Sequence, residues 1–226
     1  MKITIIIPSL NEAAHIVHTL KPLQALRQRG HQIILCDAHS HDNTRQLAQP
    51  WVDAIINTET GRARQMNAGA QQAKHDILWF LHADTYVPDN ADTIILHHLT
   101  SRSCIWGRFN IRLSGHSWLF RIIEKMMNWR SCLSGIATGD QGIFVNKAIF
   151  EQLGCYETIP LMEDIELSKK LKKISRPICI NTPLITSSRR WEQQGIVRTV
   201  LLMWYLRLAY FLGTPSEKLA RCYRQS

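Results

Sequence analysis

The sequence has 226 residues, of which 45% are hydrophobic and 20% are charged. This composition is that of an ordinary globular protein, and the length excludes a scaffold too small to hold a core without disulfides or metals. Lys and Arg outnumber Asp and Glu by 27 to 18, a surplus that favours phosphate-bearing ligands, nucleic acid or an anionic membrane surface.

The N-terminus and the cysteines indicate a cytoplasmic protein. Residues 1–7 contain one Lys and a short apolar run without a small-residue cleavage site, so they predict a first strand rather than a signal peptide. The six cysteines are far apart, and no pair has the C-x-x-C spacing of a zinc or redox site. We therefore expect free thiols in a reducing compartment.

The first half of the chain alternates between two hydrophobic patterns. Apolar, β-branched runs predict strands at 3–7, 33–36, 54–56 and 77–81, and helical spacing predicts helices at 12–29, 44–48, 62–74 and 89–99. This alternation predicts an α/β fold with a mostly parallel sheet flanked by helices, whose ligands bind beyond the carboxyl ends of the strands. Pro8, Asp37 and Asp84 each follow a predicted strand and should meet at that edge.

The second half is less regular. We expect an antiparallel strand at 105–113, a short strand at 142–145, and helices at 117–129, from 147, and at 163–174. Since no linker, repeat or low-complexity segment interrupts the chain, one domain spanning 1–226 is the simplest organisation, with 195–226 as an apolar helical extension.

Within that extension, residues 196–212 are very apolar but include Arg198 and Arg207. No run reaches the roughly 18 apolar residues that a membrane span needs. The aromatic residues of the segment suit a water–lipid interface, whereas packing on the protein body or on a second copy explains the same pattern.

Two acidic residues at strand ends have two interpretations each. Asp84 ends the run Leu78-Trp-Phe-Leu-His-Ala-Asp84, where a carboxylate can bind a divalent cation that also binds substrate phosphates, or can serve only as a turn residue. Asp37 can accept a hydrogen bond from a nucleotide base or ribose, or can belong to an ordinary loop.

Two basic segments of the sequence are candidates for binding a diphosphate. Arg62 lies at the start of a predicted helix, where free N–H groups and guanidinium groups form an anion site, although surface solubility explains it too. Arg190 and Trp191 offer a second cation and an aromatic ring that can stack on a sugar or base.

A third acidic feature is Glu163-Asp164, at the start of a predicted helix. The helix dipole favours acids at this position, which is the simpler explanation. The alternative is a general base, a carboxylate that takes the proton of a sugar hydroxyl as the new bond forms.

Taken together, these residues resemble glycosyltransferase family 2, whose members have the GT-A fold and invert the sugar configuration. Ile5-Ile-Ile-Pro-Ser-Leu-Asn-Glu12 resembles the nucleotide-binding first strand of the family, and His82-Ala83-Asp84 stands at its DXD metal motif. Glu163-Asp164 resembles its ED motif, and Arg189-Arg190-Trp191 the end of its Q-x-x-R-W motif. The resemblance implies that Asp164 is the catalytic base, that Asp84 binds Mg²⁺ or Mn²⁺, and that the base of the nucleotide lies at Asp37.

The resemblance is closer to a small subgroup, the radical-SAM/selenodomain-associated family 2 glycosyltransferases. It rests on Gly61-Arg-Ala-Arg-Gln-Met-Asn-Ala-Gly69, Phe80-Leu-His-Ala-Asp-Thr85, Gly139-Asp-Gln-Gly142 and Pro160-Leu-Met-Glu-Asp164. The substrate-binding residues implied are Pro8, Asn11, Glu12, Asp37, Arg62, Asn67, Asp84, Gly139, Asp140, Gln141, Glu163, Arg190 and Trp191. The sequence departs from the family at His82, which replaces the first Asp of the metal motif, and its Q-x-x-R-W motif is partial.

The sequence thus predicts inverting, metal-dependent transfer of a sugar from a nucleotide-diphosphate sugar to an acceptor hydroxyl. A nucleotidyltransferase is an alternative, and so is a non-catalytic nucleotide- or membrane-binding module with a degenerate metal site. We expect no nucleic-acid partner, because no basic-aromatic motif of a known module occurs. The expected location is the cytoplasm or the inner face of the membrane, with 196–212 contacting lipid or forming a homodimer.

Overall fold

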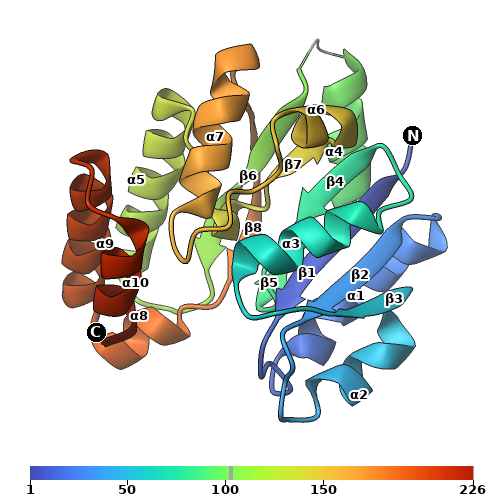
Figure 1. The fold of residues 1–226 in the computed structure, drawn as a ribbon, viewed down its shortest axis with the longest axis horizontal. Coiled ribbons are helices and arrows are strands. Elements are labelled where there is room, and N and C mark those ends of the chain that lie inside the picture. Colours follow the sequence, from blue (N-terminus) through green and yellow to red (C-terminus); the bar gives the residue numbers. More distant parts are fainter. Residues whose placement is uncertain (102–103, 226) are drawn as a thin grey trace.

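The computed structural model describes residues 1–101 and 104–225 and contains one eight-stranded mixed sheet (Figure 1). The strands are β1 (Ile3–Ser9), β2 (Gln32–Asp37), β3 (Ala54–Asn57), β4 (Ile77–Phe80), β5 (Thr85–Tyr86), β6 (Trp106–Leu113), β7 (Phe144–Asn146) and β8 (Ile178–Thr186). Their order in the sheet is β3-β2-β1-β4-β7-β6-β8-β5. The α/β class predicted from the sequence is confirmed.

The first half of the sheet is parallel, as predicted. β1 lies between β2 and β4, and β2 pairs with β3, all in parallel. Every residue of β1 and of β2 is buried, because helices cover both faces of a central parallel sheet. The register places Ser9 opposite Asp37, so the carboxyl ends of β1 and β2 meet at one edge.

The second half is mixed. β7 is antiparallel to both β4 and β6, which fits the antiparallel pairing expected for residues 105–113. On its other side β6 pairs in parallel with β8, with a register shift between Phe109 and Asn110. The pattern did not predict β8 or the short β5, which pairs with it antiparallel. Pro183 within β8 weakens the local strand signal.

The helices are α1 (Ile16–Gln28), α2 (Thr44–Ala48), α3 (Arg62–Gln71), α4 (Ala91–Ser101), α5 (Trp118–Ser134), α6 (Lys147–Gln152), α7 (Glu163–Ile174), α8 (Arg189–Gln194), α9 (Ile196–Phe211) and α10 (Ser216–Gln225). The 3₁₀ turns η1 (Gln49–Trp51) and η2 (Gly139–Gln141) complete the described elements. α1 begins four residues later than the expected Glu12, because residues 12–15 form a turn in which the N–H groups of His15 and Ile16 donate to the carbonyl of Glu12.

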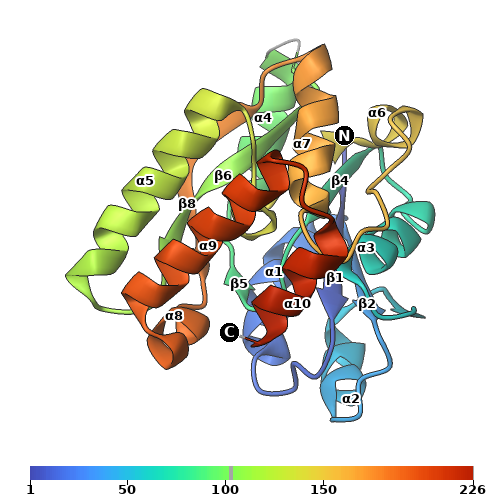
Figure 2. The ribbon, with the colours of Figure 1, turned by 60° about the vertical axis from the view of Figure 1, so that its left-hand side comes forward.

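The predicted C-terminal extension consists of α9 and α10; residue 226 lies outside the described part. α9 and α10 pack against α7 through Leu206, Leu219 and Ile165 (Figure 2). α5 and α9 lie side by side, with Phe120 and Ile123 of α5 close to Ile196 and Val200 of α9. Among the described residues, no helix is long and apolar enough to cross a membrane.

α3 lies unusually close to the sheet at Gly69. A Cβ atom built there would be 2.5 Å from Cγ2 of Ile6 and 2.8 Å from Sγ of Cys36, far inside normal contact distance. Only glycine permits this approach. Since Arg62, Gln65 and Gly69 are three or four residues apart, they share the face of α3 that meets the strand ends.

Candidate active site

Asp37 anchors the loop that follows β2. Its side chain is fully buried, and Oδ1 accepts hydrogen bonds from the hydroxyls of Ser9 (3.1 Å) and Ser40 (2.5 Å). Oδ2 accepts from the backbone N–H of Ser40 at 2.8 Å. The carboxylate that the sequence assigned to the nucleotide base is therefore engaged within the protein and shapes the wall of the site.

A second set of bonds joins the loop after β1 to the loop after β2. The N–H of Asn11 donates to Oγ of Ser40 and the side-chain Oδ1 of Asn11 accepts from the N–H of His41, both at 2.9 Å. Asn11 has a φ of 55°, a left-handed conformation that Asn tolerates better than most residues. Pro8 is buried in the ladder opposite Cys36. The predicted residues Pro8, Asn11 and Asp37 thus form one connected wall.

Gln65 fastens α3 to this wall and was not among the predicted site residues. Its buried Nε2 donates to the carbonyls of Ser9 and Cys36, both at 2.8 Å. These carbonyls lie at or next to the carboxyl ends of β1 and β2, where the parallel ladder stops. The signal in the sequence is a glutamine on the apolar face of a predicted helix, which needs buried partners.

Glu12 and Asp84 form an acidic pair at the same edge. Burial and the charge of Asp84 raise the pKa of Glu12, and burial raises the pKa of Asp84 although Arg62 and Arg189 oppose the shift. Oε2 of Glu12 is buried without a hydrogen-bond partner in the protein. This excess of buried negative charge fits a divalent cation, which prefers carboxylate oxygens and leaves positions for phosphates.

His82, which replaces the first Asp of the metal motif, lies against η2. A Cβ atom at Gly139 would be 2.6 Å from Nε2 of His82, so the imidazole packs directly on that glycine. Burial and the charge of Arg62 lower the pKa of His82 to about 3, and the ring is neutral at pH 7. Among the described residues no group of three His, Cys, Asp or Glu side chains could hold a metal, so substrate oxygens would have to complete the coordination.

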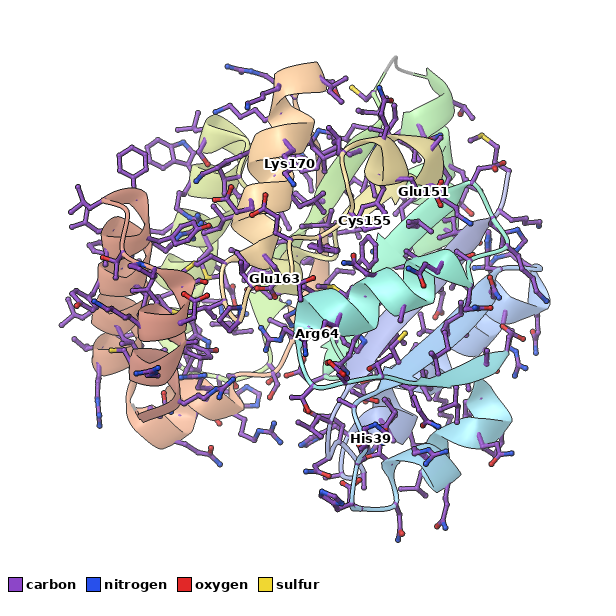
Figure 3. The ribbon with its side chains drawn as sticks, in the orientation of Figure 1. His39, Arg64, Glu151, Cys155, Glu163 and Lys170 are labelled. Carbon is purple, nitrogen blue, oxygen red and sulfur yellow. The ribbon has the colours of Figure 1, made fainter. Side chains whose placement is uncertain are left out.

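Arg62 interacts electrostatically with both acidic groups of the site. Burial lowers its pKa, but the charges of Glu163, Asp164 and Asp84 outweigh this effect and raise it. Figure 3 shows Glu163 and Arg64 near the facing N-terminal ends of α7 and α3. Both arginines retain exposed surface, but Arg64 donates to Glu59 at 2.6 Å, whereas the charge of Arg62 acts on the acidic groups of the site.

Arg189, rather than the predicted Arg190, is directed at the acidic pair. Its charge lowers the pKa of both Glu12 and Asp84, and its Nη1 lies 2.8 Å from Nε2 of His15. The guanidinium of Arg190 instead stacks 3.5 Å from the ring centre of Tyr223 and donates to the carbonyl of that residue. Arg190 therefore fastens α10 to α8.

Trp191 and Asn67 also have structural partners. Trp191 packs with Phe120 and Ile123 of α5 rather than over the strand ends. Asn67 exchanges two hydrogen bonds with the backbone of Tyr156, at 2.9 and 3.0 Å, and so fixes α3 to the loop before α7.

Asp164 is held at the start of α7 by two backbone donors. Its Oδ2 accepts from the N–H of Gly139 and its Oδ1 from the N–H of Ile165, both at 2.8 Å. Burial raises the pKa of Asp164 despite these bonds and the charge of Arg207. Met162, which precedes the pair, has a φ of 74°, a strained conformation for a side chain of this kind. A carboxylate positioned in this way and partly desolvated suits a general base.

Glu163, the neighbour of Asp164, is buried as well. Burial and the charge of Asp164 raise its pKa to about 7, although Arg62 acts in the opposite direction. The two neighbouring carboxyl groups therefore do not ionise independently, and Glu163 carries a proton over part of the neutral range.

The sequence missed two arginines that face Asp164 from distant helices. Arg207 of α9 and Arg130 of α5 both interact electrostatically with Asp164 and Asp140, and burial lowers the pKa of each, that of Arg130 to about 10. Nη2 of Arg130 and Oδ1 of Asp140 are buried without a hydrogen-bond partner in the protein. Neither arginine has a local signal of this role, because each helix carries other charged residues as well.

The turn η2 closes this side of the site. Gln141 is fully buried and its Oε1 accepts from the N–H and the hydroxyl of Thr138, forming a capping box. Burial raises the pKa of Asp140, opposed by a hydrogen bond from Thr138 and by Arg130. Of the predicted trio, Gly139 contacts Asp164, Asp140 faces the arginines and Gln141 holds the turn.

A mixed sheet with a parallel first half, flanked by helices and followed by polar side chains at the carboxyl ends of its strands, is the architecture of the GT-A fold of glycosyltransferases. The family model described as "Glycosyl transferase family 2" matches residues 4–146, and the chain belongs to this family. This confirms the family that the sequence motifs resembled.

Comparisons with individual proteins agree with the family. The chain is 25% identical over 192 residues to a poly-beta-1,6-N-acetyl-D-glucosamine synthase of Staphylococcus aureus, covering 75% of this chain and 45% of the relative. It thus spans less than half the length of that relative.

Solved structures share the fold. The mannosyltransferase PcManGT of Pyrobaculum calidifontis, in complex with GDP-Man and Mn²⁺, matches with a TM-score of 0.68 at 18% identity over 94% of this chain and 65% of the other. TarS 1–349 of S. aureus in complex with UDP-GlcNAc matches with a TM-score of 0.66 at 13% identity over 83% and 58%. At these identities the likeness shows the fold alone.

Proposed function

We propose that the protein transfers a sugar from a nucleotide-diphosphate sugar to an acceptor hydroxyl, with inversion and with the help of Mg²⁺ or Mn²⁺. The observation that carries the proposal is the electrostatic environment of Arg62, which interacts with Asp84 of the acidic pair and with Glu163 and Asp164 at the start of α7. A donor bound at Asp84 and an acceptor bound at Asp164 would both lie close to Arg62.

The donor side is the edge formed by the first two loops. The nucleotide would lie along the wall of Pro8, Asn11 and Asp37, where Asp37 keeps the loop in place through Ser9 and Ser40. Arg62 and Arg189 would bind the diphosphate, because both guanidiniums already interact with Asp84. Substrate-bound structures of PcManGT and TarS hold GDP-Man and UDP-GlcNAc, which supports a nucleotide sugar as the ligand.

Asp84 and Glu12 would hold the divalent cation. When bound there, the cation supplies positive charge that offsets the developing charge of the departing diphosphate. The buried, unpartnered Oε2 of Glu12 supports this assignment and gives Glu12 a role beyond contact with the nucleotide. The Mn²⁺ complex of PcManGT supports the choice of ion.

The acceptor side is built by η2 and α7. Asp164 would take the proton of the acceptor hydroxyl while that oxygen bonds to the anomeric carbon and the bond from this carbon to the diphosphate breaks. This single displacement on the opposite face inverts the sugar configuration. Gly139 holds the carboxylate in place, Arg207 favours its ionised form, and Glu163 and Asp140 line the same side.

Two finer assignments belong to this proposal. The phrases around Gly61, Phe80 and Gly139 support membership of the radical-SAM/selenodomain-associated subgroup. We also propose a cytoplasmic location, supported by cysteine thiols such as the buried Cys36, whose pKa burial raises to about 12.

The test is a panel of UDP-, GDP- and dTDP-sugars, with and without Mn²⁺ or Mg²⁺, followed by chromatography of the nucleotide products and NMR of the anomeric proton. Metal-dependent release of one nucleoside diphosphate with inversion is expected. Release of pyrophosphate from a nucleoside triphosphate and a sugar phosphate would instead identify a nucleotidyltransferase. Tight nucleotide binding without turnover across the panel would favour a non-catalytic module with a degenerate metal site.

A further inference from the structure

Helices α5 and α9 present two exposed apolar stripes, which together we call the outer face. Its members are Trp118, Ile122, Met126, Trp129 and Leu133 of α5, and Val197, Leu201, Trp204, Tyr205, Leu208, Phe211 and the following Leu212 of α9. Most neighbours in each set are three or four residues apart, which places each set on one side of its helix. Exposed fractions run from 45% for Met126 to 79% for Phe211.

The two stripes lie next to each other because the opposite sides of the helices are used for packing. Phe120 and Ile123 of α5 belong to a buried cluster with Ile196 and Val200 of α9. Leu206 of α9 packs towards α7 and α10. Both ribbon views show α5 and α9 as neighbours at one end of the molecule (Figures 1 and 2).

The outer face is too large for chance exposure. It contains twelve of the eighteen large hydrophobic side chains that are exposed among the described residues. Its five aromatic side chains are each more than half exposed. With about 200 Å² of surface per aromatic side chain, the five together expose on the order of 600 Å². This area alone reaches the upper end of the range for the largest apolar patch on a typical soluble monomer.

The charges of the two helices decide between a lipid surface and a second copy of the chain. α5 and α9 carry five basic residues (Arg121, Lys125, Arg130, Arg198 and Arg207) and one acidic residue, Glu124. Glu124 is buried and paired with Arg121 at 2.8 Å. Arg130 and Arg207 face Asp164, so the exposed and unpaired charges of the two helices are the cations Lys125 and Arg198. A symmetric pair of copies meeting here would bring these like charges together with no exposed carboxylate of either helix to offset them.

An anionic bilayer complements every part of the outer face. Trp and Tyr side chains prefer the boundary between water and lipid, and aliphatic side chains gain from burial beneath it. The exposed Lys125 and Arg198 would meet anionic headgroups. We propose that the outer face binds the surface of an anionic lipid bilayer, with α5 and α9 lying in its plane. This goes beyond the proposed function and does not depend on it.

Vesicle co-sedimentation with the full chain tests the proposal. Vesicles of phosphatidylcholine with about a quarter phosphatidylglycerol should sediment the protein at low salt, and 0.5 M NaCl should weaken the binding. The double variant Trp204→Ser/Leu208→Ser should lower the partition coefficient at least tenfold. The matched control, Leu47→Ser/Tyr86→Ser, replaces exposed apolar residues outside the outer face and should bind as the wild type does. Circular dichroism verifies that both variants are folded.

Three outcomes would overturn the proposal. One is a wild-type chain that does not sediment with the anionic vesicles. Another is equal binding of the wild type and of Trp204→Ser/Leu208→Ser. The third is a stable dimer in analytical ultracentrifugation that this variant dissociates, which would assign the outer face to a second copy. None of these measurements uses the transferase activity, so their failure is distinguishable from failure of the proposed function.

Discussion

The backbone N–H of Gly139 donates a 2.8 Å hydrogen bond to Oδ2 of Asp164, joining η2 to the first turn of α7. The two residues are 25 positions apart, and the bond fixes the carboxylate independently of any substrate. A second donor, the N–H of Ile165, holds the other oxygen. Such preorganisation is what a catalytic base requires.

The first prediction concerns this carboxylate. Asp164→Asn keeps the size of the side chain but removes the group that accepts the proton, so turnover should fall by about 10²–10⁴-fold. Binding of the nucleotide, measured by calorimetry, should change less than about threefold, because Asp164 belongs to the proposed acceptor side and not to the donor side. The control is Glu151→Gln, which removes an exposed carboxylate of α6. Wild-type turnover in Asp164→Asn would assign the base elsewhere.

The second prediction concerns Arg207. Its positive charge lowers the pKa of Asp164, so Arg207→Met should raise that pKa. Since the base acts when ionised, the acidic limb of the kcat/KM profile should move to higher pH by about one unit. Arg198→Met, on the exposed side of α9, should leave the limb in place. An unchanged limb in Arg207→Met would show that this arginine does not act on Asp164.

The third prediction concerns the stability of the fold. Burial and Asp164 raise the pKa of Glu163 from 4.5 to about 7. Between these values the folded chain keeps a proton that the unfolded chain releases, so the stability contributed by protonated Glu163 is present below pH 4.5 and is lost as the pH rises through 7. The loss should reach about 3 kcal/mol at most. Urea unfolding at pH 5 and pH 8 should show this decrease in the wild type and a smaller one in Glu163→Gln, whereas Glu59→Gln should behave as the wild type does.

The fourth prediction concerns the acidic pair. With UDP or GDP present, Mn²⁺ binding followed by EPR of the free ion should weaken at least tenfold in Asp84→Asn and severalfold in Glu12→Gln, because each variant removes a carboxylate that would hold the cation. Glu59→Gln removes an exposed carboxylate nearby and should not alter the affinity. Equal Mn²⁺ affinity in all four proteins would place the cation at other residues.

The fifth prediction separates two neighbouring arginines. Arg189→Met should weaken nucleotide-diphosphate binding about tenfold, since Arg189 faces Asp84 and Glu12. Arg190→Met removes the stacking on Tyr223 and should instead make α10 more sensitive to proteolysis and lower the Tm. Loss of nucleotide binding in Arg190→Met alone would restore the assignment that the sequence motif suggested.

The parts of the fold that could be predicted are those with a local signal. Short apolar runs located β1 to β4, and the polar residues after them located the edge where Asp37 and Asp84 lie. The helix that starts at Glu163-Asp164 was also predicted from its local pattern. These signals work because the hydrophobic period and the strand-end position are properties of a few consecutive residues.

The rest depends on contacts between distant segments. β8 pairs with β6 across about 70 residues and contains Pro183, so its own sequence does not predict a strand. Arg189 and Arg190 are adjacent, and only the stacking of Arg190 on Tyr223 decides which of them faces the acidic pair. Arg207 interacts with Asp164 because α9 packs against α7. No pattern of neighbouring residues predicts this packing.

Position 69 limits how the donor side could be re-engineered. The face of α3 that carries Arg62 and Gln65 rests on the strands through a glycine, with no room for even one methyl group between Ile6 and Cys36. A larger residue there would move the helix away from the sheet and take both side chains with it, so the donor side would lose the guanidinium of Arg62. A designer who wants to accommodate a bulkier nucleotide should therefore vary the loops after β1 and β2 and leave this helix at its present depth.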